Sequence, residues 1–283
     1  MSRRSVLYMP AINVRALDKA RSLNCDAIIF DLEDAVSVDQ KLEARAQLVA
    51  ELEQGGYGNR ERVVRVNGLD TQWCKADIAA VARLDIHAIL FPKINSPAEL
   101  INAQELVDAA GGQHLSLWAM LETPLGILNA NAITAASARL NVLVMGTSDL
   151  VAELRGQHTA DRMGIQAALQ HCVLVARAHA RDILDGVHLE FKDQDSFIEV
   201  CSQGRQLGFD GKTLIHPAQI EIANQVFGSS ESAVRDAHEL IAVWEKAQKS
   251  GKGVAVLNGR LIENLHVREA RRIIDVGQSQ NAK

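Results

Sequence analysis

The segment Ala27-Ile28-Ile29-Phe30-Asp31-Leu32-Glu33-Asp34 is a short apolar run that leads directly into a cluster of acids. Continuous apolar runs of this length are typical of strands buried on both faces of a parallel sheet. Further apolar runs lead into polar residues in the same way, at residues 63–66, 90–91, 117–121 and 143–145. In a parallel α/β barrel the active site lies at the carboxyl ends of the strands. The sequence therefore predicts one active site built from these strand ends.

Strand and helix patterns alternate along most of the chain. We expect strands at residues 5–10, 26–32, 62–66, 88–93, 115–122 and 141–146, with weaker patterns at 183–189 and 211–215. Helical patterns lie between and after them, at residues 14–23, 38–53, 71–84, 98–109, 127–138, 162–181, 194–207 and 217–227. This alternation predicts an α/β fold, a TIM (β/α)8 barrel. A doubly wound sheet is the rival, but the first strand is not followed by the GxGxxG turn of its dinucleotide-binding form.

The last part of the chain has a different pattern. A charged helix is expected at residues 232–249, then a hairpin at 254–262 around the tight turn Asn258-Gly259, and a short helix at 267–276. This segment has too little core to fold alone, so we expect it to pack on a barrel. The predicted domains are a catalytic barrel over residues 1–228 and a C-terminal helical and hairpin extension over residues 229–283.

Composition excludes several classes of protein. The net charge is −5, so no basic excess indicates a nucleic-acid partner. The four cysteines lie far apart without a CxxC pair, which is typical of reduced thiols in a cytoplasmic protein. The N-terminus lacks the apolar run of a signal peptide, and no stretch of ~18 apolar residues predicts a membrane span. We expect a soluble, cytoplasmic protein.

Glu122 and Asp149 are the strongest pair of candidate site residues. Each follows an apolar strand, and neighbouring strands would bring both carboxylates to the same end of the barrel. Two carboxylates that leave coordination positions open suit Mg²⁺, which prefers oxygen ligands. The alternative is that both acids only stabilise the N-terminal ends of helices. Spacing alone leaves the two interpretations about equal.

Arg65 and the acids of the second strand form another candidate group. A fixed cation at Arg65 could stabilise a developing oxyanion such as a thioester enolate, or could simply pair with the acids. Side-chain alternation sends Asp31 and Glu33 to the same side and leaves Asp34 in the loop. We interpret Glu33 and Asp34 as support for a catalytic arginine.

Two further residues have ambiguous roles. Lys93 ends a strand and could form a Schiff base if desolvated, but a salt-bridged supporting role is the favoured interpretation. His216 could be an acid, a base or a ligand contact, or only a hydrogen-bonded residue before a helix that starts at Pro217. Ser148 lies in Gly-Thr-Ser-Asp rather than GxSxG, so a serine hydrolase is not supported.

Taken together and in order, these motifs resemble the citrate lyase β-subunit-like family of the HpcH/HpaI aldolase superfamily, which includes malyl-CoA and citramalyl-CoA lyases. The resemblance covers nearly the whole chain. The matching segments are residues 4–10 (RSVLYMP), 30–36 (FDLEDAV), 65–67 (RVN), 92–93 (PK), 122–126 (ETPLG), 146–150 (GTSDL), 209–212 (FDGK), 215–217 (IHP) and 258–263 (NGRLIE).

The resemblance implies a TIM barrel enzyme that uses Mg²⁺ and acts on 3-hydroxyacyl thioesters. By this resemblance Glu122 and Asp149 are the Mg²⁺ ligands and Arg65 stabilises the enolate. It also implies that a small set of residues lines the coenzyme A site: Arg4, Lys19, Ile215, His216 and Pro217.

In such proteins the C-terminal segment reaches over the active site of a neighbouring subunit, commonly in trimers or hexamers. The resemblance therefore implies a homo-oligomer, in which Glu263 supplies a general acid to the neighbouring site. Two residues depart from the family pattern: Ala11 stands where Gly is frequent, and Glu263 stands where several lyases have Asp.

The expected activity is a carbon–carbon lyase. It would cleave a thioester of the malyl-CoA, citramalyl-CoA or citryl-CoA type into acetyl-CoA, or a homologue, and an α-oxo acid such as glyoxylate or pyruvate. One alternative is a 3-hydroxyacyl-CoA thioesterase of the same family. Others are a Schiff-base aldolase that uses Lys93 and a non-catalytic subunit that binds coenzyme A or an acyl carrier protein.

Overall fold

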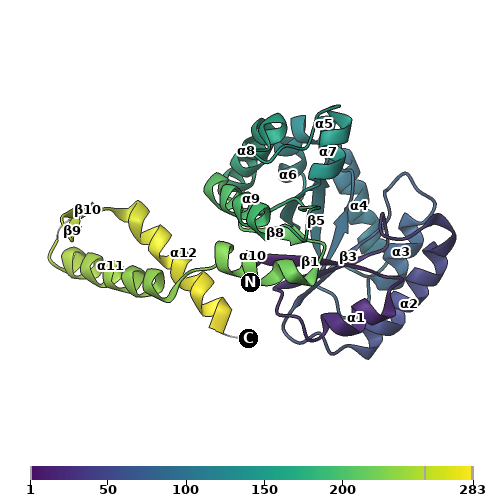
Figure 1. The fold of residues 1–283 in the computed structure, drawn as a ribbon, viewed down its shortest axis with the longest axis horizontal. Helices are drawn as coiled ribbons and strands as arrows, with labels where there is room; N and C mark the ends of the chain where they lie inside the picture. The colour runs from purple at the N-terminus through teal and green to yellow at the C-terminus, as the bar shows by residue number, and fades with distance from the viewer. Residues whose placement is uncertain (1, 252, 282–283) are drawn as a thin grey trace. The chain divides into compact units, whose positions relative to one another are not determined.

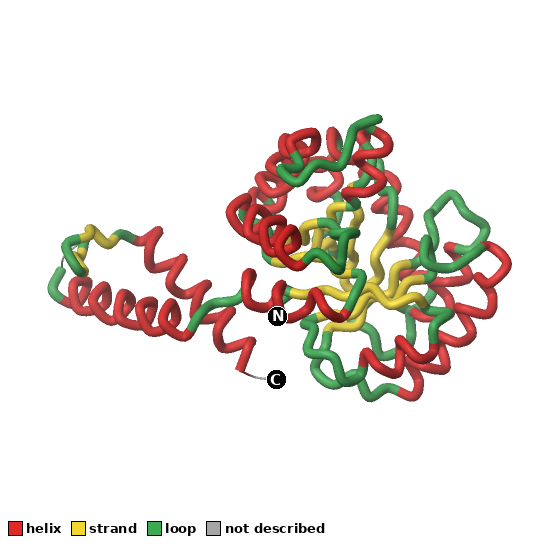
Figure 2. Tube along the Cα trace, in the orientation of Figure 1, coloured by secondary structure: helices red, strands yellow, loops and turns green. Residues whose placement is uncertain are grey.

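The computed structural model of the protein describes residues 2–251 and 253–281. Residues from Arg3 to Val226 form one compact unit, and residues from Phe227 onward form another. The first unit is a closed barrel of eight parallel strands in the order β1 to β8, surrounded by helices (Figures 1 and 2). The predicted TIM barrel is therefore confirmed.

The barrel elements lie close to the predicted ranges. The strands are β1 (Ser5–Pro10), β2 (Ala27–Asp31), β3 (Glu61–Arg65), β4 (Ala88–Phe91), β5 (Ser116–Leu121), β6 (Leu140–Met145), β7 (Asp182–Asp185) and β8 (Gly211–Leu214). The helices are α1 (Val14–Ala20), α2 (Lys41–Gln54), α3 (Cys74–Val81), α4 (Pro97–Ala109), α5 (Pro124–Leu128), α6 (Ala130–Ala135), α7 (Thr147–Glu153), α8 (Met163–Ala178), α9 (Gln194–Leu207) and α10 (Ile220–Phe227). Two short 3₁₀ helices cover Val38–Gln40 and Pro217–Gln219.

Alternation along the strands places one set of side chains inside the barrel. A cluster of buried apolar residues from seven strands fills this interior, with Trp118 as its largest member. In β2, Ala27 and Ile29 belong to the cluster, and Asp31 follows two residues later on the same face. In β3, Val63 is followed by Arg65 in the same way. The candidate site residues therefore form the last layer of the barrel interior, at the carboxyl ends of the strands.

Among the barrel elements, three differ most from the sequence expectation. The helix expected at residues 127–138 is two helices, since α5 starts earlier, where Pro124 follows the capping residue Thr123, and Asn129 separates it from α6. The strand expected to reach residue 189 ends at Asp185, before Gly186. The helix α7 was not predicted, because its seven residues are too few to show a clear periodicity.

Ion pairs lie at the amino ends of the strands. The Arg3 guanidinium binds both Glu61 and Asp182, and Arg4 binds Asp26 with Nη2 to Oδ1 at 2.8 Å. All four cysteines of the chain are buried and unbridged, which confirms the expectation of free thiols: Cys25, Cys74, Cys172 and Cys201. No helix in the described part of the chain is both long and apolar enough to cross a membrane.

The second unit is a helical hairpin with a small sheet. Helices α11 (Glu231–Lys249) and α12 (Asn264–Asn281) pack against each other through an apolar seam (Figure 1). Between them, β9 (Ala255–Leu257) and β10 (Arg260–Ile262) form the predicted antiparallel hairpin. Both residues of its turn have positive φ, 49° at Asn258 and 74° at Gly259, as expected for this kind of tight turn.

Candidate active site

A cavity of about 390 Å³, called the cleft below, lies at the carboxyl ends of the barrel strands. Its lining includes Tyr8 from β1, Arg65 from β3, Glu122 after β5, Asp149 in α7 and Ile215 after β8. Residues from both sides of the closed barrel thus meet around one space. The expectation of a single site built from strand ends fits this arrangement.

Arg65 is anchored by the strand next to it. The barrel register pairs Asp31 of β2 with Arg65 of β3, so their side chains lie side by side. Nε and Nη2 of Arg65 donate to the two Asp31 oxygens at 2.7 and 2.6 Å, a bidentate pair that fixes the plane of the guanidinium. The guanidinium also lies over the Tyr8 ring, with 4.9 Å between its carbon and the ring centroid. Burial alone would lower the pKa of Arg65, but Asp31 and Tyr8 raise it well above its ordinary value.

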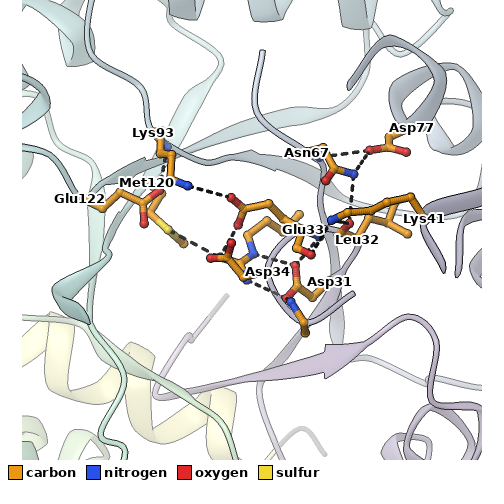
Figure 3. A network of polar contacts seen from close by, with 12 residues as sticks. Asp31, Leu32, Glu33, Asp34, Lys41, Asn67, Asp77, Lys93, Met120 and Glu122 are labelled. Atoms are coloured by element: carbon orange, nitrogen blue, oxygen red, sulfur yellow. Dashed lines mark hydrogen bonds and ion pairs between the residues drawn. The ribbon is translucent and has the colours of Figure 1, made fainter. Parts of the chain in front are cut away.

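Two more acids lie on the open side of Arg65. Nη1 of Arg65 is 2.8 Å from Glu33 Oε2 and 3.6 Å from Asp34 Oδ2. Glu33 is buried and also pairs with Lys93 Nζ at 3.5 Å, as Figure 3 shows. Burial raises the pKa of Glu33 to about 7, although Arg65 acts in the opposite direction. Asp34 is exposed and lines the cleft.

The backbone around Glu122 is shaped to receive its carboxylate. Glu122 is 1% exposed, and its Oε1 accepts a hydrogen bond from the Lys93 backbone N–H at 2.8 Å. A Cβ atom on Gly146 would lie 2.4 Å from both Cβ and Oε2 of Glu122, so only glycine leaves room for this side chain. Burial and the charges of Asp149 and Glu33 raise the pKa of Glu122 to about 8. A buried carboxylate with this pKa would be strongly stabilised by a cation.

Asp149 is the second carboxylate at this side of the cleft, and it lies in the first turn of α7. It is half-buried, and none of the described residues hydrogen-bonds or ion-pairs with its carboxylate. No cluster of three or more His, Cys, Asp or Glu side chains that could hold a metal ion occurs among the described residues. Two carboxylates fit Mg²⁺ as ligands, provided that water or substrate oxygens fill the remaining positions.

Lys93 is held in a supporting arrangement. Its backbone is left-handed, with φ 52°, and its side chain is half-exposed beside Glu33. Burial acts to lower the pKa of Lys93, but the carboxylates of Glu33 and Asp34 raise it above its ordinary value. A lysine that forms a Schiff base must lose its proton, so this environment opposes such a role.

The expected coenzyme A contacts lie in different places. Ile215 lines the cleft, and His216 stacks on Phe191 with 4.5 Å between the ring centroids. Nδ1 of His216 accepts a hydrogen bond from the Ala218 N–H and caps the 3₁₀ helix that starts at Pro217. These three expected contact residues therefore follow β8, beside the cleft.

Arg4 and Lys19 do not join this group. Arg4 precedes β1 and is buried against Asp26 at the amino ends of the strands, which is the opposite end of the barrel from the cleft. Lys19 is exposed in the last turn of α1. The barrel core separates Arg4 from the cleft, and its contact with coenzyme A stays a prediction from the resemblance. Glu263 is exposed in the second unit, between β10 and α12.

Some residues of the cleft were not predicted. Tyr8 lies under Arg65, Met120 contacts Nη1 of Arg65 through its sulfur at 4.0 Å, and Gly146 makes room for Glu122. In the sequence, Tyr8 and Met120 look like ordinary strand residues. Only the alternation of side chains along the strands, which puts them on the same face as the interior cluster, could have placed them at the site.

Comparison with known proteins relates this geometry to a family. A family model described as HpcH/HpaI aldolase/citrate lyase matches residues 4–217. The chain belongs to the HpcH/HpaI aldolase/citrate lyase family. The resemblance seen in the sequence is thereby confirmed.

Members of this family with curated names carry two different activities. A (3S)-malyl-CoA thioesterase of Cereibacter sphaeroides (strain ATCC 17029 / ATH 2.4.9) is 51% identical over 271 residues, which are 96% of this chain and 93% of that protein. A citrate lyase subunit beta of Leuconostoc mesenteroides subsp. cremoris is 32% identical over 287 residues, covering 99% and 94%. The relative named as a thioesterase, which was the alternative expectation, is thus more similar in sequence than the relative named as a citrate lyase subunit.

A solved structure has a similar fold. It is the protein CitE of Mycobacterium tuberculosis in complex with magnesium, acetoacetate and coenzyme A. Its TM-score is 0.78 at 26% sequence identity, and the match covers 98% of both chains. Another structure is the citrate lyase beta subunit of M. tuberculosis complexed with oxaloacetate and magnesium, with a TM-score of 0.69 at 28% identity over 80% of this chain and 97% of that one.

Proposed function

We propose that the protein is a Mg²⁺-dependent thioesterase that hydrolyses a 3-hydroxyacyl-CoA of the malyl-CoA type. The observation that carries this proposal is the 51% identity, over 96% of the chain, to a (3S)-malyl-CoA thioesterase. The magnesium and coenzyme A in the related CitE structure support the choice of metal and thioester.

Glu122 and Asp149 are the residues that would hold the metal. When bound, Mg²⁺ would supply a Lewis acid that polarises the acid portion of the substrate. Glu122 is preorganised for this role by the Lys93 N–H and by the space at Gly146. Asp149 lines the same cleft from α7.

Arg65 and its neighbouring acids would carry out the hydrolysis. The fixed guanidinium stabilises the oxyanion that develops on the thioester carbonyl when water attacks it. Asp34 lines the cleft with Oδ2 3.6 Å from Nη1 of Arg65, so it holds the attacking water and accepts its proton. The C–S bond then breaks and leaves the carboxylic acid, and the proton that Asp34 accepted passes to the thiolate, which leaves as free coenzyme A. Glu33 keeps Arg65 and Lys93 in place.

The decisive test separates hydrolysis from carbon–carbon cleavage. Purified protein is incubated with (3S)-malyl-CoA and Mg²⁺, and the products are identified by mass spectrometry. Malate plus free coenzyme A in equal amounts supports the proposal, whereas acetyl-CoA plus glyoxylate would show a lyase. Glu122→Gln and Asp149→Asn should each abolish turnover, as should removal of the metal with EDTA. Full turnover in metal-free buffer would overturn the metal assignment.

A second candidate function is the lyase, which is supported by the citrate lyase relatives at 30 to 32% identity. In this reaction Arg65 holds the enolate of acetyl-CoA, and Glu263 from a neighbouring subunit returns the proton. This candidate requires a homo-oligomer, a trimer or hexamer, with a site shared between chains. Mixing Arg65→Met chains with Glu263→Gln chains tests the sharing, because hybrid assemblies regain intact sites only if Glu263 acts on its neighbour.

A further inference from the structure

Tyr8 lies in the cleft beside the residues of the proposed hydrolysis. It belongs to β1 and packs against the apolar cluster that fills the barrel interior. The same residue lines the cleft, together with Arg65 and Glu122. The side chain of Tyr8 therefore lies at the boundary between the apolar core and the polar residues of the cleft.

The hydroxyl group of Tyr8 has no hydrogen-bond partner among the residues that the structure describes. It is also absent from the buried polar atoms that lack both a partner and contact with solvent, and Tyr8 as a whole is half-buried. The second tyrosine of the chain differs, since Tyr57 is 1% exposed and its hydroxyl lies 3.5 Å from the Leu17 carbonyl oxygen. The Tyr8 hydroxyl is thus a hydrogen-bonding group that the protein itself leaves unused.

The surroundings of Tyr8 keep this hydroxyl protonated. Burial raises the pKa of Tyr8, and the carboxylates of Asp31 and Glu122 add to the rise, whereas the Arg65 guanidinium acts in the opposite direction. The pKa of Tyr8 is raised above its ordinary value as a result. A neutral phenol donates one hydrogen bond, so Tyr8 can donate to an oxygen atom that carries negative charge.

The ring of Tyr8 lies against the group that is proposed to bind the thioester carbonyl; this step rests on the proposed function. The guanidinium carbon of Arg65 is 4.9 Å from the ring centroid. Asp31 binds Nε and Nη2 of Arg65, which leaves Nη1 on the side of Glu33 and the cleft. Arg65 and Tyr8 therefore present a charged donor and a neutral donor to the same part of the cleft. Donors that are fixed before the reaction are those that stabilise a developing charge most effectively.

We propose that Tyr8 is a further catalytic residue, whose hydroxyl donates a hydrogen bond, beside Arg65, to the oxyanion that develops on the thioester carbonyl. The proton stays on Tyr8 throughout, so the proton balance of the hydrolysis is unchanged. This hydrogen bond becomes stronger as negative charge develops on the carbonyl oxygen. It should therefore affect kcat more than KM.

Replacement of Tyr8 by phenylalanine tests this role, because it removes the hydroxyl and keeps the ring under Arg65. The thioester of the malyl-CoA type that the protein turns over fastest is used, with Mg²⁺ present. In Tyr8→Phe the kcat should fall about 10²-fold while KM stays within about threefold, as expected for the loss of one oxyanion donor.

Tyr57→Phe is the matched control. The ring of Tyr57 also lies under a guanidinium, with the carbon of Arg21 at 4.8 Å from its centroid, but Tyr57 lies outside the cleft. This variant should keep kcat within about twofold of the unmodified protein. A kcat of Tyr8→Phe within about tenfold of that of Tyr57→Phe would overturn the proposal.

Binding of a substrate analogue separates the proposed contact from a general disturbance of the cleft. The analogue is the CoA thioether in which a methylene group replaces the thioester carbonyl, and calorimetry in the presence of Mg²⁺ measures its Kd. The unmodified protein and Tyr8→Phe should bind it equally, because the oxygen that Tyr8 contacts is missing. Weaker binding to Tyr8→Phe would show that the hydroxyl contacts another part of the ligand or supports the cleft, and would overturn the proposal.

Product analysis separates this inference from the proposed function. Acetyl-CoA plus glyoxylate from malyl-CoA would overturn the proposed hydrolysis. A matching loss of kcat in Tyr8→Phe would then still support Tyr8, since an enolate carries its charge on the same carbonyl oxygen. Hydrolysis to malate and free coenzyme A, with kcat unchanged in Tyr8→Phe, would overturn this inference alone.

Discussion

Arg65 and Asp31 are joined by two parallel hydrogen bonds of 2.7 and 2.6 Å across neighbouring barrel strands, and both side chains are buried. Such a bidentate pair fixes the direction of the remaining guanidinium nitrogen as well as the charge. Nη1 of Arg65 is thereby directed toward Glu33, Asp34 and the cleft.

Replacement of Arg65 by lysine should therefore not be conservative. A single ammonium group cannot bind both Asp31 oxygens and a developing oxyanion, so Arg65→Lys should lower kcat/KM by about 10² to 10³. The matched control is Arg45→Lys, because Arg45 also pairs with a buried aspartate, Asp77 at 2.7 Å, but lies outside the cleft. Steady-state kinetics measures kcat/KM for both variants. A kcat/KM of Arg65→Lys within tenfold of that of Arg45→Lys would contradict this role.

The titration of Glu122 predicts that the stabilising effect of Mg²⁺ depends on pH. Burial raises the pKa of Glu122 from an ordinary 4.5 to about 8 in the metal-free protein. The contribution of this group to stability is complete below pH 4.5 and is lost as the pH rises through 8, since the unfolded chain releases the proton first. A bound cation offsets this loss.

Thermal unfolding at several pH values checks this expectation. The difference in Tm between Mg²⁺-loaded and metal-free protein should be larger at pH 9 than at pH 6. Glu122→Gln should make the Tm of the metal-free protein less dependent on pH and should remove most of the Mg²⁺ effect. An equal Mg²⁺ effect at both pH values in the unmodified protein would count against Glu122 as a ligand.

Gly146 is expected to be essential for metal binding although it has no side chain. In Gly146→Ala the new Cβ would lie 2.4 Å from Glu122 Oε2, so the carboxylate must move and the Mg²⁺ affinity should fall by at least tenfold. Gly164→Ala is the control, because no atom lies within 4 Å of its Cβ position and it lies in the first turn of α8. Calorimetric titration measures the Mg²⁺ affinity of both variants. Equal affinities would show that Glu122 does not bind the ion.

Lys93 should prove dispensable for the chemistry. Half-exposed ion pairs such as that of Lys93 with Glu33, at 3.5 Å, contribute little free energy. Lys93→Met should therefore lower kcat/KM by less than about tenfold. Borohydride reduction in the presence of glyoxylate or pyruvate should leave the mass of the peptide that contains Lys93 unchanged. A trapped adduct on Lys93 would instead support a Schiff-base aldolase.

The sequence predicted the barrel well because its strands are short, apolar and regularly spaced. Elements that depend on tertiary context were harder to predict from the sequence. The helix α7 is only seven residues long, yet it carries Asp149, and Asp185 at the end of β7 belongs to a buried network with Arg162 and Lys212. Periodicity cannot show a network of this kind, because its members lie far apart in the chain.

The candidate site was predictable to the extent that strand ends meet at one end of a barrel. Arg65, Glu122 and Asp149 follow from this rule, as does the pairing of Arg65 with Asp31. The coenzyme A role of Arg4 came from the resemblance and not from this rule, because Arg4 precedes β1 instead of following it. The roles of Glu263 and of the second unit depend on other chains and stay predictions.

The buried cysteines make the proposed reaction convenient to follow. Burial raises the pKa of Cys74, Cys172 and Cys201 to about 12, and Cys25 is likewise buried. Thiol-reactive dyes attack thiolates, so the folded protein should contribute almost no background colour while released coenzyme A reacts at once. The same dye reports unfolding, because denaturation exposes four thiols per chain. One reagent can therefore record both the progress of hydrolysis and the integrity of the catalyst.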